Sequence, residues 1–122
     1  MFRNLRLVYI TTPTKEEAKS IAKALLEQKL VACANIIEGM TSLYEWEGEI
    51  KEESECVLLL KAPYHNIARI TKRVTSLHSA EVPCVVSLTL TEQEGNEAFL
   101  DWILQQAPHS EYEIRSADDF QY

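Results

Sequence analysis

Few residues of this 122-residue chain have the types that metal binding requires. His78 and Cys84 offer an imidazole and a thiolate, which are ligand types that suit both Cu(I) and Zn(II). Two ligands are too few for a tight site. A histidine at a helix C-terminus also interacts favourably with the helix dipole, so a structural role for His78 is the alternative. The sequence therefore predicts at most a weak metal site, formed by His78 and Cys84.

A second group of potential ligands is a run of glutamates in the middle of the chain. Carboxylate oxygens suit hard divalent cations, but alternating acids on a long strand do not converge as a coordination sphere must. We therefore interpret this run as a solvated surface, neutralised in part by Arg69, Lys72 or Arg73 of a neighbouring chain. Its members are Glu45, Glu47, Glu49, Glu52, Glu53 and Glu55.

The sequence contains no pattern that indicates catalysis. It has no nucleophile–base constellation, no Gly-rich phosphate loop, and neither an H-E-x-x-H nor a C-x-x-C motif. An acylphosphatase-type enzyme would need a Gly-rich anion loop with an arginine after the first strand, where this chain has Thr11-Thr12-Pro13-Thr14. We expect a protein that is not an enzyme and that requires no cofactor.

The net charge and the hydropathy limit the partners. A formal charge of -7 disfavours nucleic acid and anionic membranes, because both need a basic surface, and it favours cations or basic partners. The N-terminus lacks a signal-peptide pattern and no long apolar run occurs, so we expect a cytoplasmic protein without a membrane segment. Cys33, Cys56 and Cys84 are odd in number and surrounded by apolar residues, which predicts buried reduced thiols on strands.

The elements that would position these residues alternate between strand and helix. Strands are expected at residues 5–12, 30–37 and 82–91, and helices at 14–29, at 63–78 and after Asn96. Thr14 and Glu17 form a capping-box pattern, and Asn96 can cap the last helix. A short edge strand could follow Pro108, in the sequence S-E-Y-E-I-R-S. Residues 1–122 are thus expected to form one domain.

The longest feature is a hairpin from Met40 to Ala62, in which Gly48 supplies the left-handed turn position. Gly39, directly before the hairpin, is expected to form a bulge within one long strand. Its second arm would span roughly 40 Å, whereas a domain of this length has a radius of gyration of about 14 Å. The outer half carries Tyr44, Trp46 and Ile50, which would face water unless another copy of the chain covered them. We interpret the hairpin as an assembly arm.

The order of elements is βαββαβ with an extra C-terminal helix. Two right-handed βαβ crossovers give an α+β ferredoxin-like sandwich, with four antiparallel strands and two helices on one face. The other sheet face is left bare by this topology. In an acidic, soluble chain, the C-terminal helix or other subunits must cover it.

These motifs resemble those of the CutA divalent-cation tolerance proteins over residues 7–104. The resemblance implies a homotrimer of ferredoxin-like subunits, similar in shape to PII signalling proteins, whose long hairpins pair between neighbours. The matching segments are Thr11–Pro13, Leu30–Asn35, Ser42–Ile50, Leu58–Lys61, Glu81–Pro83 and Asn96–Ile103.

The resemblance also implies a role in tolerance to copper and other divalent metals. One bacterial member of the family is described with a Cys, His and Glu site, whose positions correspond here to Ile10, His78 and the neighbourhood of Cys84. The H-P-Y segment of the family reads His78-Ser79-Ala80. We therefore expect a trimer that binds copper weakly. The alternatives are a PII-like sensor with small-molecule clefts between subunits, and a purely structural or partner-binding trimer.

Overall fold

The computed structural model describes residues 3–108, and the edge strand expected after Pro108 lies outside this range. Strands and helices alternate along the described chain as the sequence predicts. Their bounds are β1 Leu5–Thr12, α1 Lys15–Glu27, β2 Cys33–Trp46, β3 Glu49–Pro63, α2 Ile67–Leu77, β4 Val85–Thr89 and α3 Glu97–Gln106.

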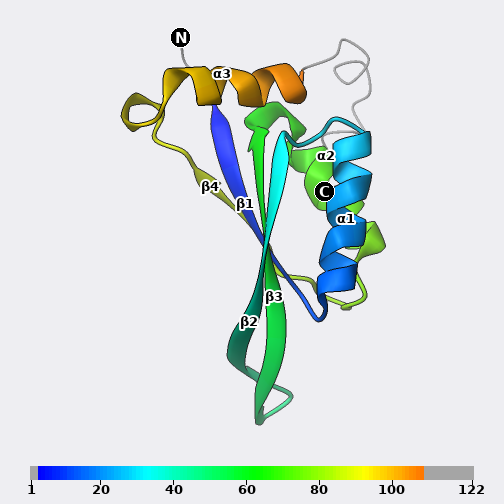
Figure 1. Cartoon of the computed structure of the whole chain (residues 1–122). Helices are drawn as coiled ribbons and strands as arrows, with labels where there is room; N and C mark the ends of the chain where they lie inside the picture. Colours follow the sequence, from blue (N-terminus) through cyan, green and yellow to red (C-terminus); the bar gives the residue numbers. More distant parts are fainter. Residues whose placement is uncertain (1–2, 109–122) are drawn as a thin grey trace.

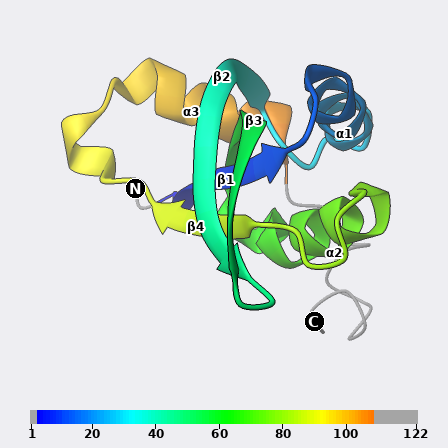
Figure 2. The ribbon, with the colours of Figure 1, turned by 90° about the horizontal axis from the view of Figure 1, so that it is seen from below.

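The strands form a four-stranded antiparallel sheet in the order β2-β3-β1-β4. Figures 1 and 2 show α1 and α2 on one side of this sheet, while α3 crosses its upper end. This arrangement is the expected α+β ferredoxin-like sandwich. The first strand, β1, lies inside the sheet between β3 and β4, a position that its nearly continuous apolar sequence favours.

The hairpin of β2 and β3 extends beyond the body of the protein. β1 stops pairing with β3 at Thr12 and Cys56, whereas β2 and β3 continue to pair from Met40 and Glu55 as far as Trp46 and Glu49. Figure 1 shows this outer part projecting below the rest of the sheet. The length argument from the sequence is therefore confirmed.

Two glycines shape the hairpin at the predicted positions. At the tip, Glu47 and Gly48 have φ values of 52° and 82°, the succession of left-handed residues that a tight hairpin turn requires. Gly39 has a φ of 81°, and the β2–β3 register shifts between Ile37 and Met40. This irregularity is the bulge expected within one long strand, and it bends the arm relative to the body.

The helix caps follow the sequence only in part. The Thr14 hydroxyl accepts a hydrogen bond from the Glu17 backbone N–H, and Asn96 caps α3 in the same manner. The Glu17 carboxylate accepts from the backbone N–H of Ser79 at 3.0 Å, which ties α1 to the loop after α2. The capping pair thus also makes a long-range contact that the local pattern did not indicate.

The bounds of β2, α2 and β4 differ from the expected ones. β2 begins at Cys33 and not at Leu30, because residues 28–32 connect α1 to β2 without strand pairing. α2 begins at Ile67 after a 3₁₀ turn and not at Pro63, because Pro63 is still extended and pairs with Leu5 at the end of β3. β4 covers Val85–Thr89, which is shorter than the expected 82–91, since its pairing with β1 runs only from Ile10–Val85 to Arg6–Thr89.

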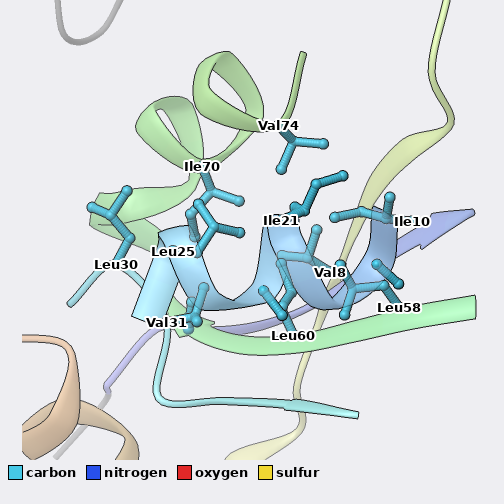
Figure 3. Packing of buried hydrophobic residues seen from close by; sticks show 13 residues of the cluster. Val8, Ile10, Ile21, Leu25, Leu30, Val31, Leu58, Leu60, Ile70 and Val74 are labelled. Carbon is cyan, nitrogen blue, oxygen red and sulfur yellow. The ribbon is translucent and has the colours of Figure 1, made fainter. Parts of the chain in front are cut away.

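The main core lies between the sheet and the two helices that cover it. Figure 3 shows the side chains of α1 and α2 meeting those of β1 and β3. A smaller cluster under α3 is made by Leu5, Ala32, Leu100 and Ile103. The residues labelled in the main core are Val8, Ile10, Ile21, Leu25, Leu30, Val31, Leu58, Leu60, Ile70 and Val74.

A buried carboxylate anchors the start of β1 to the segment before α3. Glu92 is 5% exposed and accepts hydrogen bonds from the backbone N–H groups of Arg3 and Asn4, each at 2.9 Å. Burial on its own raises the pKa of Glu92, but these N–H groups and the Arg3 guanidinium outweigh it, so the pKa lies below its ordinary value. The anchor therefore holds while Glu92 is ionised.

Among the helices of residues 3–108, none has the length and apolar character needed to cross a membrane.

Candidate functional site

The sheet face opposite α1 and α2 exposes apolar side chains. On this face, Val86 and Leu88 of β4 are 50% and 51% exposed, and Ile37 of β2 is 54% exposed. They alternate with residues that point toward the helices, as expected for a pleated sheet with one covered face. An exposed apolar surface of this kind marks an interaction site.

The arm continues the same surface. The Tyr9 hydroxyl lies 3.5 Å from the Met40 sulfur, so the face of β1 that α1 and α2 leave open leads directly onto the outer hairpin. Trp46 at the tip is 47% exposed, and Ile50 across the ribbon is 80% exposed. The exposed apolar groups thus run from the sheet to the end of the arm.

A cleft of about 490 Å³ lies between the arm and the loop that joins α2 to β4. Its walls combine aromatic rings, carboxylates and the candidate ligand pair predicted from the sequence. The residues that define its chemistry are Tyr44, Trp46, Glu53, Glu55, His78 and Cys84.

The carboxylates of the cleft interact with neighbouring side chains and do not converge on one point. The Tyr44 hydroxyl is hydrogen-bonded to the Glu53 carboxylate, which, together with burial and the nearby charge of Glu55, raises the pKa of Tyr44. Further along the arm, the Lys51 ammonium lies 3.2 Å from the Glu49 carboxylate. Within residues 3–108, no group of three or more His, Cys, Asp or Glu side chains is placed to hold a metal ion.

The His78 side chain is only 2% exposed and is held by the protein through both ring nitrogens. Nε2 lies 2.7 Å from the Thr11 carbonyl oxygen, and Nδ1 accepts a hydrogen bond from the Ala80 backbone N–H at 3.0 Å. The Glu17 carboxylate is 3.4 Å from Nδ1. His78 therefore connects β1, α1 and the α2–β4 loop, and a metal could bind it only by displacing one of these partners.

The cysteines lie in three different environments, so the expectation that all three are buried on strands is wrong for Cys84. Cys56 is buried and Cys33 is partly buried, whereas Cys84 is exposed and precedes β4. Because Pro83 stands before it and β4 pairing begins only at Val85, Cys84 belongs to the loop and faces the cleft. Ile10, which the resemblance matches to the cysteine of one bacterial member, is fully buried.

The fold and the cleft together define a small ferredoxin-like protein with an extended β2–β3 hairpin. Residues 6–106 match the family of the CutA1 divalent ion tolerance protein. The chain belongs to this family. The "Divalent-cation tolerance protein CutA" of Thermus thermophilus is 45% identical over 97 residues, which are 80% of this chain and 92% of the relative.

Solved structures agree with this assignment. The divalent ion tolerance protein CutA1 of Ehrlichia chaffeensis has a TM-score of 0.82 at 35% identity, covering 89% of this chain and 100% of its own. The Thermus thermophilus protein has a TM-score of 0.80 at 43% identity, with 84% and 98% covered. The CutA of Archaeoglobus fulgidus, described as a periplasmic divalent cation tolerance protein, has a TM-score of 0.80 at 37% identity, with 84% and 98% covered.

Proposed function

We propose that this chain is a non-enzymatic subunit of a homotrimer that acts in tolerance to divalent cations. The related proteins carry this role in their names, and the resemblance of the motifs implies the trimer. The observation that supports assembly here is the apolar surface that runs from Val86 and Leu88 along the sheet to Trp46 on the arm. Neighbouring copies would cover this surface through the hairpin of residues 40–62.

We further propose a cytoplasmic location and partners other than nucleic acid or membrane. The three free cysteines suit a reducing compartment, where thiols are not paired. The net charge of -7 opposes attraction to nucleic acid and to anionic lipid. The protein thus acts on cations or on its own copies in the cytoplasm.

Sedimentation equilibrium of the full chain is expected to give the mass of a trimer at micromolar concentration. The large exposed apolar area of the isolated subunit provides the free energy for association, because each Å² of apolar surface removed from water contributes about 25 cal/mol. A monomer at that concentration would reject the assembly proposal. A dimer would keep the arm as an interface but reject the trimer.

We also propose that the protein binds copper weakly, with Cys84 as the main ligand. The Cys84 side chain is exposed in the cleft, and a thiolate suits Cu(I). His78 lines the same cleft but would have to release the Thr11 carbonyl or the Ala80 N–H to bind a metal. The cost of that exchange supports weak binding of copper or another soft metal, and Cys84 would contribute more than His78.

In a competition with a Cu(I) chelator, Cys84→Ser is expected to weaken binding by about tenfold or more, equivalent to about 1.4 kcal/mol. His78→Ala should have a smaller effect. Binding to the parent should also weaken as the pH falls, because protons compete with the metal for the thiolate. Cys33→Ser is the matched control, since this thiol lies outside the cleft. Equal binding by all four proteins would contradict the assignment to Cys84.

A PII-like sensor is the second candidate function. The cleft of about 490 Å³ supports it, because it has the size of a small-molecule site and is bounded by the arm that a neighbour would cover. A panel of metals, nucleotides and metabolites in a thermal-shift assay separates the candidates. Stabilisation by a metabolite and by no metal would favour the sensor over metal binding.

A further inference from the structure

The exposed side of α2 carries a stripe of polar side chains, three of which are basic. Arg69, Lys72, Arg73 and Ser76 follow one another at i, i+3, i+4 and i+7, a spacing that places them on one face of a helix. The opposite face carries Ile70 and Val74, which are fully buried in the main core. α2 contains no acidic residue, although the whole chain has a net charge of -7. Positive charge is thus concentrated on this one surface.

This stripe forms the wall of a second cleft, of about 300 Å³, where α2 passes the end of α1. Among residues 3–108, none that lines it carries a carboxylate, in contrast to the first cleft with its Glu53 and Glu55. The lining residues are Gln28, Leu30, Arg69, Lys72, Arg73 and Ser76.

Arg73 brings an unsatisfied hydrogen-bond donor to the cleft. Its Nε atom is buried, and no hydrogen-bond partner for it lies within the described residues. A buried charged donor without a partner is unfavourable, so native structures rarely leave one unsatisfied. Because the Arg73 side chain lines the cleft, an anion bound there can accept from its guanidinium.

We propose that the cleft between α1 and α2 binds a small anion that carries a phosphate group. The planar guanidinium of Arg73 matches two phosphate oxygens at once, and the Lys72 ammonium adds a point charge. The Gln28 amide also lines the cleft and can donate a further hydrogen bond. The size of the cleft suits one or two phosphate groups better than an extended ligand.

The site is independent of the proposed assembly. α1 and α2 lie together on one side of the sheet in Figures 1 and 2, whereas the exposed Val86 and Leu88 belong to the other side. A trimer formed through the sheet and the arm would therefore leave the second cleft open. This proposal replaces the interpretation from the sequence that Arg69, Lys72 or Arg73 neutralises the glutamates of a neighbouring arm. Cations would be bound in one cleft and anions in the other, which goes beyond a role in cation tolerance.

Pyrophosphate added to the full chain at constant ionic strength, without divalent cations, tests the proposal. Saturable amide shifts in NMR spectra are expected for residues of α2 and for Gln28. Arg73→Gln should weaken binding by about tenfold or more, since it removes a charge and the two-oxygen contact. Arg73→Lys should fall between the parent and Arg73→Gln, because it keeps the charge but loses the planar fork.

Lys23→Gln is the matched control, as it removes the same charge from an exposed position on α1 outside the cleft. Its affinity for pyrophosphate should equal that of the parent. Shifts that do not saturate, or equal losses in Arg73→Gln and Lys23→Gln, would overturn the proposal, because both outcomes indicate general attraction to positive charge. Well-dispersed spectra of each variant without ligand establish that the fold is intact.

Discussion

Replacing Leu88 by lysine is expected to dissociate the assembly and leave the subunit folded. In the isolated chain the Leu88 side chain is 51% exposed, so a lysine there can remain in water. In the proposed trimer the same position is covered, and an unpaired ammonium would be buried against apolar surface. Such an uncompensated charge costs about 3–5 kcal/mol. The dissociation constant should therefore rise by at least about a hundredfold for each contact.

Sedimentation equilibrium and far-UV circular dichroism together measure this outcome. Leu26→Lys is the matched control, because Leu26 is 40% exposed on α1, on the covered side of the sheet. It makes the same chemical change and should leave the mass unchanged. If Leu88→Lys and Leu26→Lys sediment alike as trimers, the open sheet face is not the interface.

Trp46→Ala is expected to weaken assembly by about 2–4 kcal/mol, the range of a hot-spot tryptophan, which is about 30-fold or more in dissociation constant. Trp46 belongs to the last pair of the hairpin, opposite Glu49, and lies beyond the reach of the subunit's own core. A large ring that is 47% exposed there gains most from a neighbour's surface. The unfolding midpoint of the dissociated subunit should change little.

Concentration-dependent sedimentation of the parent and Trp46→Ala gives the two dissociation constants. Tyr64→Ala serves as the control, since it removes an exposed aromatic ring, 53% accessible, from a position outside the arm. Comparable weakening by the two substitutions would show that loss of aromatic surface in general, and not the tip of the arm, governs association.

The sequence predicted the parts of the fold that local rules determine. The hairpin was visible because Gly48 marks a turn between two extended runs, and its protrusion followed from its length alone. The bulge at Gly39 could be predicted because the extended pattern resumes at once after the glycine. In each case the cause lies within a few residues of the effect.

The candidate site depends on contacts between distant segments, and these could not be predicted. His78 Nε2 is held by the Thr11 carbonyl, 67 positions away, so this contact could not be predicted from the residues around His78. Nothing in the sequence around Glu92 indicates a buried acid, because its partners are the distant backbone N–H groups of Arg3 and Asn4. Cys84 was expected on a strand, but its exposure depends on where the pairing of β4 with β1 begins.

The glutamates of the arm affect the solubility of a subunit before it enters the proposed trimer. Beyond the body of the protein the hairpin is a two-stranded ribbon, and in the described part of the chain its outer edges pair with no further strand. Unpaired strand edges are templates on which other chains can add and grow into fibres. Repulsion between the carboxylates on the two arms opposes the stacking of one ribbon on another, as gatekeeper charges do beside aggregation-prone strands. A newly synthesised subunit can therefore remain in solution before it enters the proposed trimer.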